Sequence, residues 1–286
     1  MTVTDASSFG DIPPEYRRTD QARVVVLPVP YDRTSTWIKG ADRGPQAIIE
    51  ASANLELYDI ETDSQVFLDG IVTDAPIEGD LAPEDMVAAV RQRVETHLAN
   101  QKFTVVVGGE HSVSIGAVQA HAGAYPGMTV LQLDAHADLR DKYQGSKYNH
   151  ACVMARVKEL CPVVQVGIRS MDVSEKQAIE EDRCFRAEEI HGSTTWINQV
   201  ASRLGKEVYI TIDLDVFDPS IMPSTGTPEP GGLLWYEVLA LLKTVTRRTT
   251  VVGFDVVELC PTETNRAPDF LAAKLIYKLL SYRFRG

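Results

Sequence analysis

The sequence is poor in cysteine, contains no long apolar run and has no excess of basic residues. Its cysteines form no Cys-x-x-Cys pair and stand far apart, at Cys152, Cys161, Cys184 and Cys260. Isolated thiols in a chain of this length are typical of a reduced, cytoplasmic protein and argue against a disulfide-stabilised secreted fold. No stretch approaches the roughly 18 apolar residues of a membrane span, and the polar, acidic N-terminus is not that of a signal peptide.

Acidic residues outnumber basic ones, with 40 Asp plus Glu against 28 Lys plus Arg and a formal net charge of −12. Nucleic acids and anionic membrane surfaces attract proteins of the opposite charge, so we expect neither as a main partner. A cationic small molecule is compatible with this balance.

Short apolar runs alternate with amphipathic segments along the chain. The runs are rich in β-branched residues and predict strands at 23–30, 66–72, 103–107, 128–133, 163–168, 208–214 and 250–257. Helices are predicted between them, among others at 45–54, 83–100, 152–160, 233–246 and 268–282. Near-continuous apolar strands separated by helices indicate an α/β fold, a three-layer αβα domain with a mainly parallel sheet. We expect one domain at 21–286, preceded by a polar N-terminal arm at 1–20.

Metal-ligand side chains cluster where three of these predicted strands end. They are His111, Asp134, His136, Asp138, Asp213 and Asp215. In parallel sheets, ligands bind beyond the carboxyl ends of the strands. If the backbone stays extended from 134 to 138, alternate side chains lie on one face and converge. Each group alone has a simpler interpretation as a helix cap or a loop charge, but six together predict a shared site for two divalent ions.

The donor set limits the metal. Four carboxylates and two imidazoles suit Mn, Zn, Fe or Ni better than the all-oxygen cage that calcium prefers. In two-metal sites the ions lie about 3.5–4 Å apart and share bridging ligands.

The blocks around these residues resemble the signature motifs of a known family. Gly108-Gly109-Glu110-His111-Ser112, the segment 134–138 (DAHAD) and the segment 213–219 (DLDVFDP) are similar to the three signatures of the arginase/agmatinase ureohydrolases. The segments 225–232 and 255–258 extend the resemblance, which is nearest to bacterial agmatinases. The resemblance implies an arginase-like fold, two Mn²⁺ per subunit and a homo-oligomer, trimer or hexamer.

The resemblance also assigns the ligands of each ion. One ion would be held by His111, Asp134, Asp138 and Asp213. The other would be held by His136, Asp134, Asp213 and Asp215, so that Asp134 and Asp213 bridge the pair.

Further residues match catalytic and substrate-binding positions of the family. Glu258 matches the carboxylate that binds the guanidinium group, and His150 matches the proton-shuttle histidine. Asp138 is a second candidate for proton transfer, and Thr227 matches a hydroxyl on the substrate side. For Glu258 and His150 the alternative is an ordinary surface residue, and for Thr227 it is a turn residue.

The implied reaction is hydrolysis of a guanidino compound to urea and a primary amine. Agmatine, giving putrescine, is the first choice, because the loop 141–149 departs from the arginase pattern and the segments 167–170 and 225–232 look like the agmatinase branch. Guanidinobutyrate, guanidinopropionate, arginine and formimidoylglutamate remain open. A carboxylate-bearing substrate would need a cationic anchor, for which the sequence offers Arg33, Arg140, Lys142 and Lys147.

Two other classes remain as alternatives. The chain can be a non-catalytic, metal-binding regulatory subunit, although every ligand position holds a ligand-type residue. A metal-dependent deacetylase of similar architecture would need a different ligand set.

Overall fold

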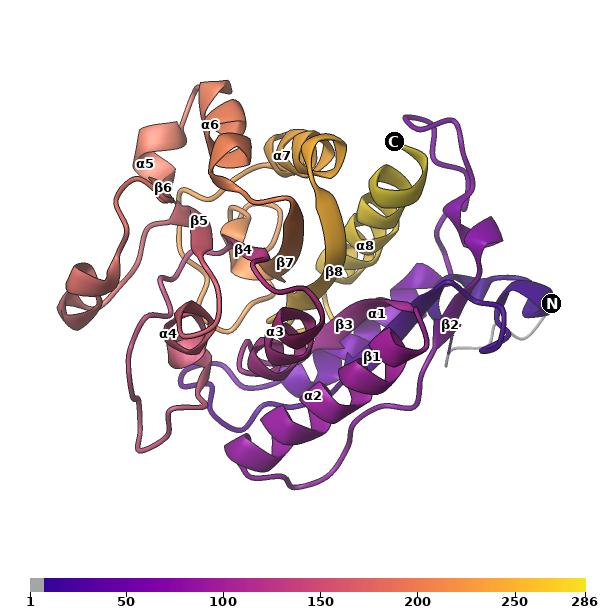
Figure 1. The fold of residues 1–286 in the computed structure, drawn as a ribbon, viewed down its shortest axis with the longest axis horizontal. Coiled ribbons are helices and arrows are strands. Elements are labelled where there is room, and N and C mark those ends of the chain that lie inside the picture. Colours follow the sequence, from indigo (N-terminus) through magenta and orange to yellow (C-terminus); the bar gives the residue numbers. More distant parts are fainter. Residues whose placement is uncertain (1–7) are drawn as a thin grey trace.

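An eight-stranded parallel sheet forms the centre of the computed structural model, which describes residues 8–286 (Figure 1). The strands are β1 (Val24–Val29), β2 (Ile71–Thr73), β3 (Phe103–Gly108), β4 (Thr129–Leu133), β5 (Val163–Ile168), β6 (Cys184–Arg186), β7 (Glu207–Asp213) and β8 (Thr250–Val257). Their order across the sheet is β2-β1-β3-β8-β7-β4-β5-β6, and every neighbouring pair is parallel. The last strand of the chain therefore lies in the middle of the sheet.

Helices cover both faces of the sheet, which confirms the predicted three-layer αβα fold (Figure 1). They are α1 (Gly44–Ser52), α2 (Pro83–Ala99), α3 (Val113–Ala124), α4 (Val153–Lys158), α5 (Ala187–Ile190), α6 (Thr195–Arg203), α7 (Trp235–Arg248) and α8 (Ala267–Arg285). The core on one face contains side chains of α1, α6, α7 and α8, and the core on the other face contains those of α2, α3 and α4. Among residues 8–286, no helix is long and apolar enough to cross a membrane.

The central strands are buried on both faces, and this explains their composition. Every residue of β1, β3, β4 and β5 is buried. Such strands gain from apolar, β-branched side chains on both sides, so they appear in the sequence as continuous apolar runs. This is why the sequence pattern located them.

The predicted strand at 66–72 is only partly correct. A 3-10 helix occupies Val66–Asp69, and the strand β2 begins at Ile71. Gly70 separates the two with a φ of +78°, a conformation that interrupts an extended strand and suits glycine. The apolar run therefore contains two short elements.

Part of the predicted N-terminal arm is held against the domain. Phe9 and Ile12 are fully buried in the core beside α1, and the Gly10 N–H donates to Ser52 Oγ at 2.8 Å. Residues 1–7 of the predicted arm lie outside the described residues. The division of the chain at residue 20 stays a prediction.

Candidate metal centre

Four neighbouring strands carry the predicted metal ligands and Glu258 at their carboxyl ends, on one side of the sheet. His111 follows β3, Glu258 follows β8, and Asp213 ends β7, while the segment 134–138 follows β4. These strands are adjacent in the order β3-β8-β7-β4. Residues far apart in the chain therefore meet because their strands end side by side.

The turn after β3 depends on a glycine. A Cβ atom on Gly109 would lie 2.0 Å from the carbonyl oxygen of Tyr31, so only glycine fits there. The chain passes through this point into α3, and the turn places His111 just before Ser112, the N-cap residue of that helix.

The segment after β4 turns as it reaches the site and is extended only in part. The strand ends at Leu133, and the Asp134 carboxylate accepts a hydrogen bond from the N–H of His136 at 2.6 Å. Asp138 has a φ of +52°, in the left-handed region. The condition of an extended backbone from 134 to 138 is thus met only in part: His136 still forms a parallel bridge with Ser170, while the Asp134 side chain bonded to the backbone two residues on stabilises a turn.

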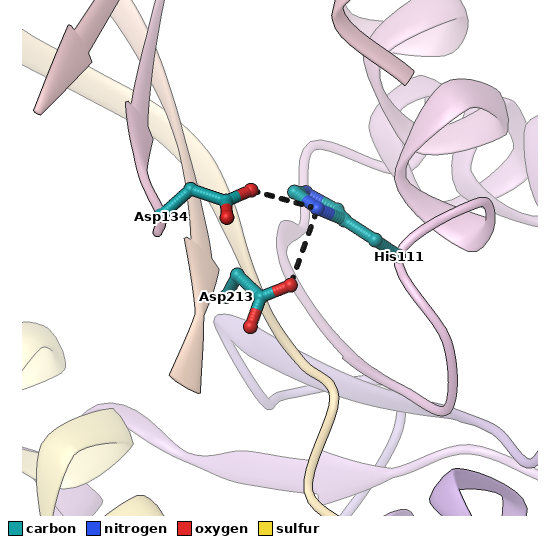
Figure 2. Close-up of side chains that lie close together, drawn as sticks. All are labelled: His111, Asp134 and Asp213. Carbon is teal, nitrogen blue, oxygen red and sulfur yellow. Dashed lines mark ion pairs between the residues drawn. The ribbon is translucent and has the colours of Figure 1, made fainter. Parts of the chain in front are cut away.

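The first ligand group surrounds one ring nitrogen of His111. Its Nδ1 lies 3.0 Å from Asp138 Oδ2, 3.2 Å from Asp134 Oδ2 and 3.4 Å from Asp213 Oδ2. Figure 2 shows the side chains of His111, Asp134 and Asp213 pointing toward one another. Nδ1 is buried, and among the described residues it has no hydrogen-bond partner.

The second ligand group lies beside the first and shares Asp134 with it. His136 Nδ1 is 2.9 Å from Asp215 Oδ2 and 3.7 Å from Asp134 Oδ1. The ligand atoms of His111, Asp134 and Asp213 all lie within 4.8 Å of one another, and so do those of Asp134, His136 and Asp215. The structure thus brings all six predicted ligands together, with the Asp134 carboxylate between the two imidazoles.

The hydrogen bonds of His111 leave its Nδ1 available to bind a metal ion. Its Nε2 lies 2.9 Å from Thr211 Oγ1, and the Thr211 hydroxyl donates to Asp255 Oδ1 at 2.6 Å. Because that hydroxyl hydrogen is used on Asp255, Nε2 carries the proton of the neutral ring and Nδ1 presents a lone pair. A lone pair facing carboxylate oxygens is satisfied by a shared cation.

The charges of the cluster also fit divalent cations. Burial and the neighbouring Asp215 raise the pKa of Asp213 well above its usual range, and burial and Asp134 raise the pKa of Asp138 to about 7. Buried carboxylates repel one another in this way unless a cation compensates them. Two divalent ions would bring four positive charges against four carboxylates, so the residues present fit a two-metal centre.

A buried row of polar side chains supports the ligands from within the sheet. Gln165, Gln132, Thr211 and Asp255 lie in one register across β5, β4, β7 and β8. Gln165 Nε2 donates to Gln132 Oε1 at 2.6 Å, and Gln132 Nε2 donates to Asp134 Oδ2 at 2.7 Å. Sequence reasoning gave none of these residues a role in the site, although each is a polar residue within a predicted strand.

A cavity of about 300 Å³ opens beside the two groups. Glu258, His150 and Thr227 line it, as do His111, His136, Asp138, Asp213 and Asp215. Glu258 is held in place by the backbone N–H of His111, which donates to Glu258 Oε1 at 2.7 Å. All the predicted catalytic and substrate-side residues thus reach the same cavity.

The cavity wall is acidic, and its one described Lys or Arg is Arg140. Arg140 already lies 3.6 Å from Asp172, and its guanidinium carbon is 4.6 Å from the centre of the Tyr143 ring. Of the other anchors that the sequence offered, Arg33 pairs with Asp80 and Lys147 with Asp141, and neither they nor Lys142 line the cavity among the described residues.

Comparison with known proteins identifies the family. The family model described as "Arginase family" matches residues 22–281. The chain belongs to the arginase family. Membership confirms the expectation of a metal-dependent hydrolase of guanidino compounds.

Relatives of this ureohydrolase indicate the agmatinase type. It is 42% identical over 272 residues to the N(1)-aminopropylagmatine ureohydrolase of Synechocystis, covering 91% of this chain and 89% of that protein. It is 34% identical to the agmatinase of Pyrococcus horikoshii, covering 92% and 93%. The crystal structure of the agmatine ureohydrolase of Thermoplasma volcanium superimposes with a TM-score of 0.85 at 30% identity, covering 100% of this chain and 95% of that one.

Proposed function

We propose that this ureohydrolase cleaves a linear guanidinoalkyl polyamine to urea and an amine, with two Mn²⁺ ions held by His111, Asp134, His136, Asp138, Asp213 and Asp215. The observation that carries the proposal is the meeting of these six side chains at the floor of an acidic cavity. Their mixed oxygen and nitrogen donors suit Mn²⁺. When bound, the metal pair supplies hydroxide as a nucleophile at neutral pH.

Glu258 binds the guanidinium group in this proposal. A carboxylate accepts two parallel N–H bonds from the planar cation, and such charge-assisted pairs fix orientation as well as adding affinity. The His111 N–H uses one lone pair of Glu258 Oε1, so both carboxylate oxygens can still accept an N–H from the substrate. Thr227 lines the same cavity and offers a hydroxyl to the substrate.

His150 and Asp138 move the protons. Burial lowers the pKa of His150 to about 4, so the ring is neutral at neutral pH and first acts as a proton acceptor. Asp138 takes the proton released when the tetrahedral carbon forms and passes it to the His150 ring. His150 then delivers that proton to the leaving nitrogen as the C–N bond breaks.

The cavity favours polyamine substrates over acidic ones. Its single described Lys or Arg, Arg140, is already engaged by Asp172 and Tyr143, so a substrate carboxylate would find no free cation there. Because the relative from Synechocystis is named for N(1)-aminopropylagmatine, we propose that compound as the first candidate substrate, with urea and spermidine as products, and agmatine, our sequence-based choice, as the second.

A urea-release assay tests the proposal. Metal-free protein is reconstituted with Mn²⁺, Zn²⁺, Ni²⁺ or Fe²⁺, and offered N(1)-aminopropylagmatine, agmatine, arginine, guanidinobutyrate and formimidoylglutamate. We expect the highest kcat/KM with Mn²⁺ and a polyamine. Turnover of arginine or guanidinobutyrate above both polyamines would contradict the substrate class, and no urea from any of them would favour the non-catalytic alternative.

The remaining expectations stay predictions. A homo-oligomer, trimer or hexamer, is tested by light scattering of the purified protein. A cytoplasmic location is tested by cell fractionation, and agrees with the four cysteines, all free and buried.

A further inference from the structure

A buried carboxylate beside the metal ligands has no part in the chemistry proposed so far. Glu110 precedes His111 in the chain, is fully buried and belongs to neither ligand group. Burying a carboxylate costs free energy unless hydrogen bonds or a cation compensate it, so its hydrogen-bond partners indicate which segment it holds.

Four hydrogen-bond donors surround Glu110. Its Oε2 accepts from the backbone N–H groups of Thr34 at 2.5 Å and Ser35 at 3.0 Å. Its Oε1 accepts from the hydroxyls of Thr34 at 2.6 Å and Ser112 at 2.5 Å. The two backbone N–H groups can only donate, and both hydroxyls donate to Oε1, so every polar group in contact with the Glu110 carboxylate is a donor to it. Glu110 therefore holds the loop that begins at Thr34, and residues 35–38 of that loop line the cavity.

Thr34 connects Glu110 to His150. Its Oγ1 accepts a hydrogen bond from the backbone N–H of His150 at 3.0 Å and lies 3.1 Å from His150 Nδ1. Since the hydroxyl hydrogen points to Glu110, Thr34 Oγ1 has only lone pairs left for His150. His150 Nδ1 must then be the donor, and the proton of the neutral ring lies on Nδ1.

The other ring nitrogen of His150 is consequently the one available to the cavity. Thr34 does not line the cavity among the described residues, whereas His150 does. With the proton on Nδ1, Nε2 presents a lone pair that can accept a proton from the reacting group. In the opposite tautomer Nε2 would carry a hydrogen and could not accept one.

We propose that Glu110 and Thr34 are positioning residues, which fix the ring orientation and the tautomer of His150 through the relay Glu110–Thr34–His150. This rests on the proposed role of His150 as proton carrier.

Two substitutions at Thr34 distinguish the effect of losing the hydroxyl from the effect of changing the packing of the side chain. Thr34→Val keeps the shape and removes the hydroxyl, and Thr34→Ser keeps the hydroxyl and removes a methyl. Because general acid–base catalysis contributes typically about 10²–10⁴-fold, we expect Thr34→Val to lower kcat about 10- to 100-fold, with KM within about 3-fold. We expect Thr34→Ser to stay within about 3-fold of wild type in both.

The chain offers a matched control for the loss of a buried threonine–histidine hydrogen bond. Thr104 Oγ1 lies 3.0 Å from His121 Nε2, and neither residue lines the cavity among those described. Thr104→Val should leave kcat and KM unchanged. Mn²⁺ content should equal that of wild type in all three variants.

The tautomer itself can be measured without turnover. The chain has six histidines, so ¹⁵N-histidine-labelled protein loaded with diamagnetic Zn²⁺ gives few ring signals, and His150→Gln assigns that of His150. A ring nitrogen with a proton and one with a lone pair have distinct ¹⁵N shifts. We expect the Nδ1–H form alone in wild type and Thr34→Ser, and a mixture of both forms in Thr34→Val.

Several results would overturn the relay. A wild-type His150 with its proton on Nε2 would do so, as would a pure Nδ1–H form in Thr34→Val. An equal loss of kcat in the valine and serine variants would assign the effect to loop packing and refute the role of the hydroxyl. A wild-type protein that releases no urea from any guanidine would refute the proposed function, while the NMR spectra would still decide the tautomer.

Discussion

Removing the hydroxyl of Thr211 should weaken divalent metal binding about 10- to 100-fold, the range typical for a partner that orients a metal-binding histidine. Thr211→Val keeps a β-branched side chain in β7 and deletes the group between His111 and Asp255. The Nε2–H of His111 then has no acceptor in a fully buried place, at a cost of about 1–3 kcal/mol. Each 1.4 kcal/mol is about tenfold in affinity, so both estimates agree.

The assay is calorimetric titration of Mn²⁺ into chelator-treated protein, with metal content after dialysis as a second readout. Thr211→Ser keeps the hydroxyl and should bind as wild type does. Thr129→Val is the matched control, because Thr129 starts the neighbouring strand β4 at its opposite end and its hydroxyl accepts only from Gly205 among the described residues. The reasoning fails if Thr211→Val binds Mn²⁺ like wild type, or if Thr129→Val weakens binding equally.

Three further predictions concern the shared ligand, the substrate carboxylate and pH. Asp134→Asn should lose Mn²⁺ on dialysis and release no urea, since it removes a charge from both ligand groups; metal analysis showing full occupancy would contradict this. Glu258→Gln should lower kcat/KM about 10- to 150-fold, because a hydrogen bond to a charged group contributes about 1.5–3 kcal/mol, while Mn²⁺ content stays unchanged; steady-state kinetics with agmatine checks it. Burial lowers the pKa of His121 to about 4, below the 6.5 of the unfolded chain. The stability that depends on a neutral His121 is therefore fully present above pH 6.5 and is lost as the pH falls toward 4. At about 1.36 kcal/mol per pKa unit, the free energy of unfolding, measured by denaturation in urea, falls by about 3 kcal/mol. A His121→Gln variant should show a correspondingly weaker pH dependence of this free energy.

The sequence was sufficient for the layers and for the set of candidate ligands. Strands buried on both faces must be apolar, and carboxylates at their ends are costly without a cation. Both patterns can therefore be recognised in the sequence alone. The order of the strands was not visible, because the position of β8 between β3 and β7 depends on contacts between distant parts of the chain. The left-handed backbone of Asp138 was not predicted either, and its carbonyl accepts from the N–H groups of Met154 and Ala155, which are distant in the sequence.

Loop geometry accounts for the other limits of prediction. Arg33 and Lys147 were as plausible as Arg140 as anchors, and only the structure shows that they pair with Asp80 and Asp141 and do not line the cavity among the described residues. Gln132 and Thr211 carried a weak signal, because one polar residue in an apolar strand can equally be a satisfied core residue. Their shared register, which joins them to Asp134 and His111, requires the sheet.

The central position of β8 has a consequence for synthesis of the protein. The strand begins at Thr250, late in the chain, yet it inserts between two strands that were made earlier. Until it arrives, β3 and β7 have no common neighbour, and the residues that they carry cannot be brought to their final separation. Such late, long-range pairing is slow and leaves strand edges open in the meantime. A chain interrupted before residue 250 would therefore contain all six ligands, and β4 and β7 could still pair and carry five of them, but His111 would lack the strand that sets its distance from the others.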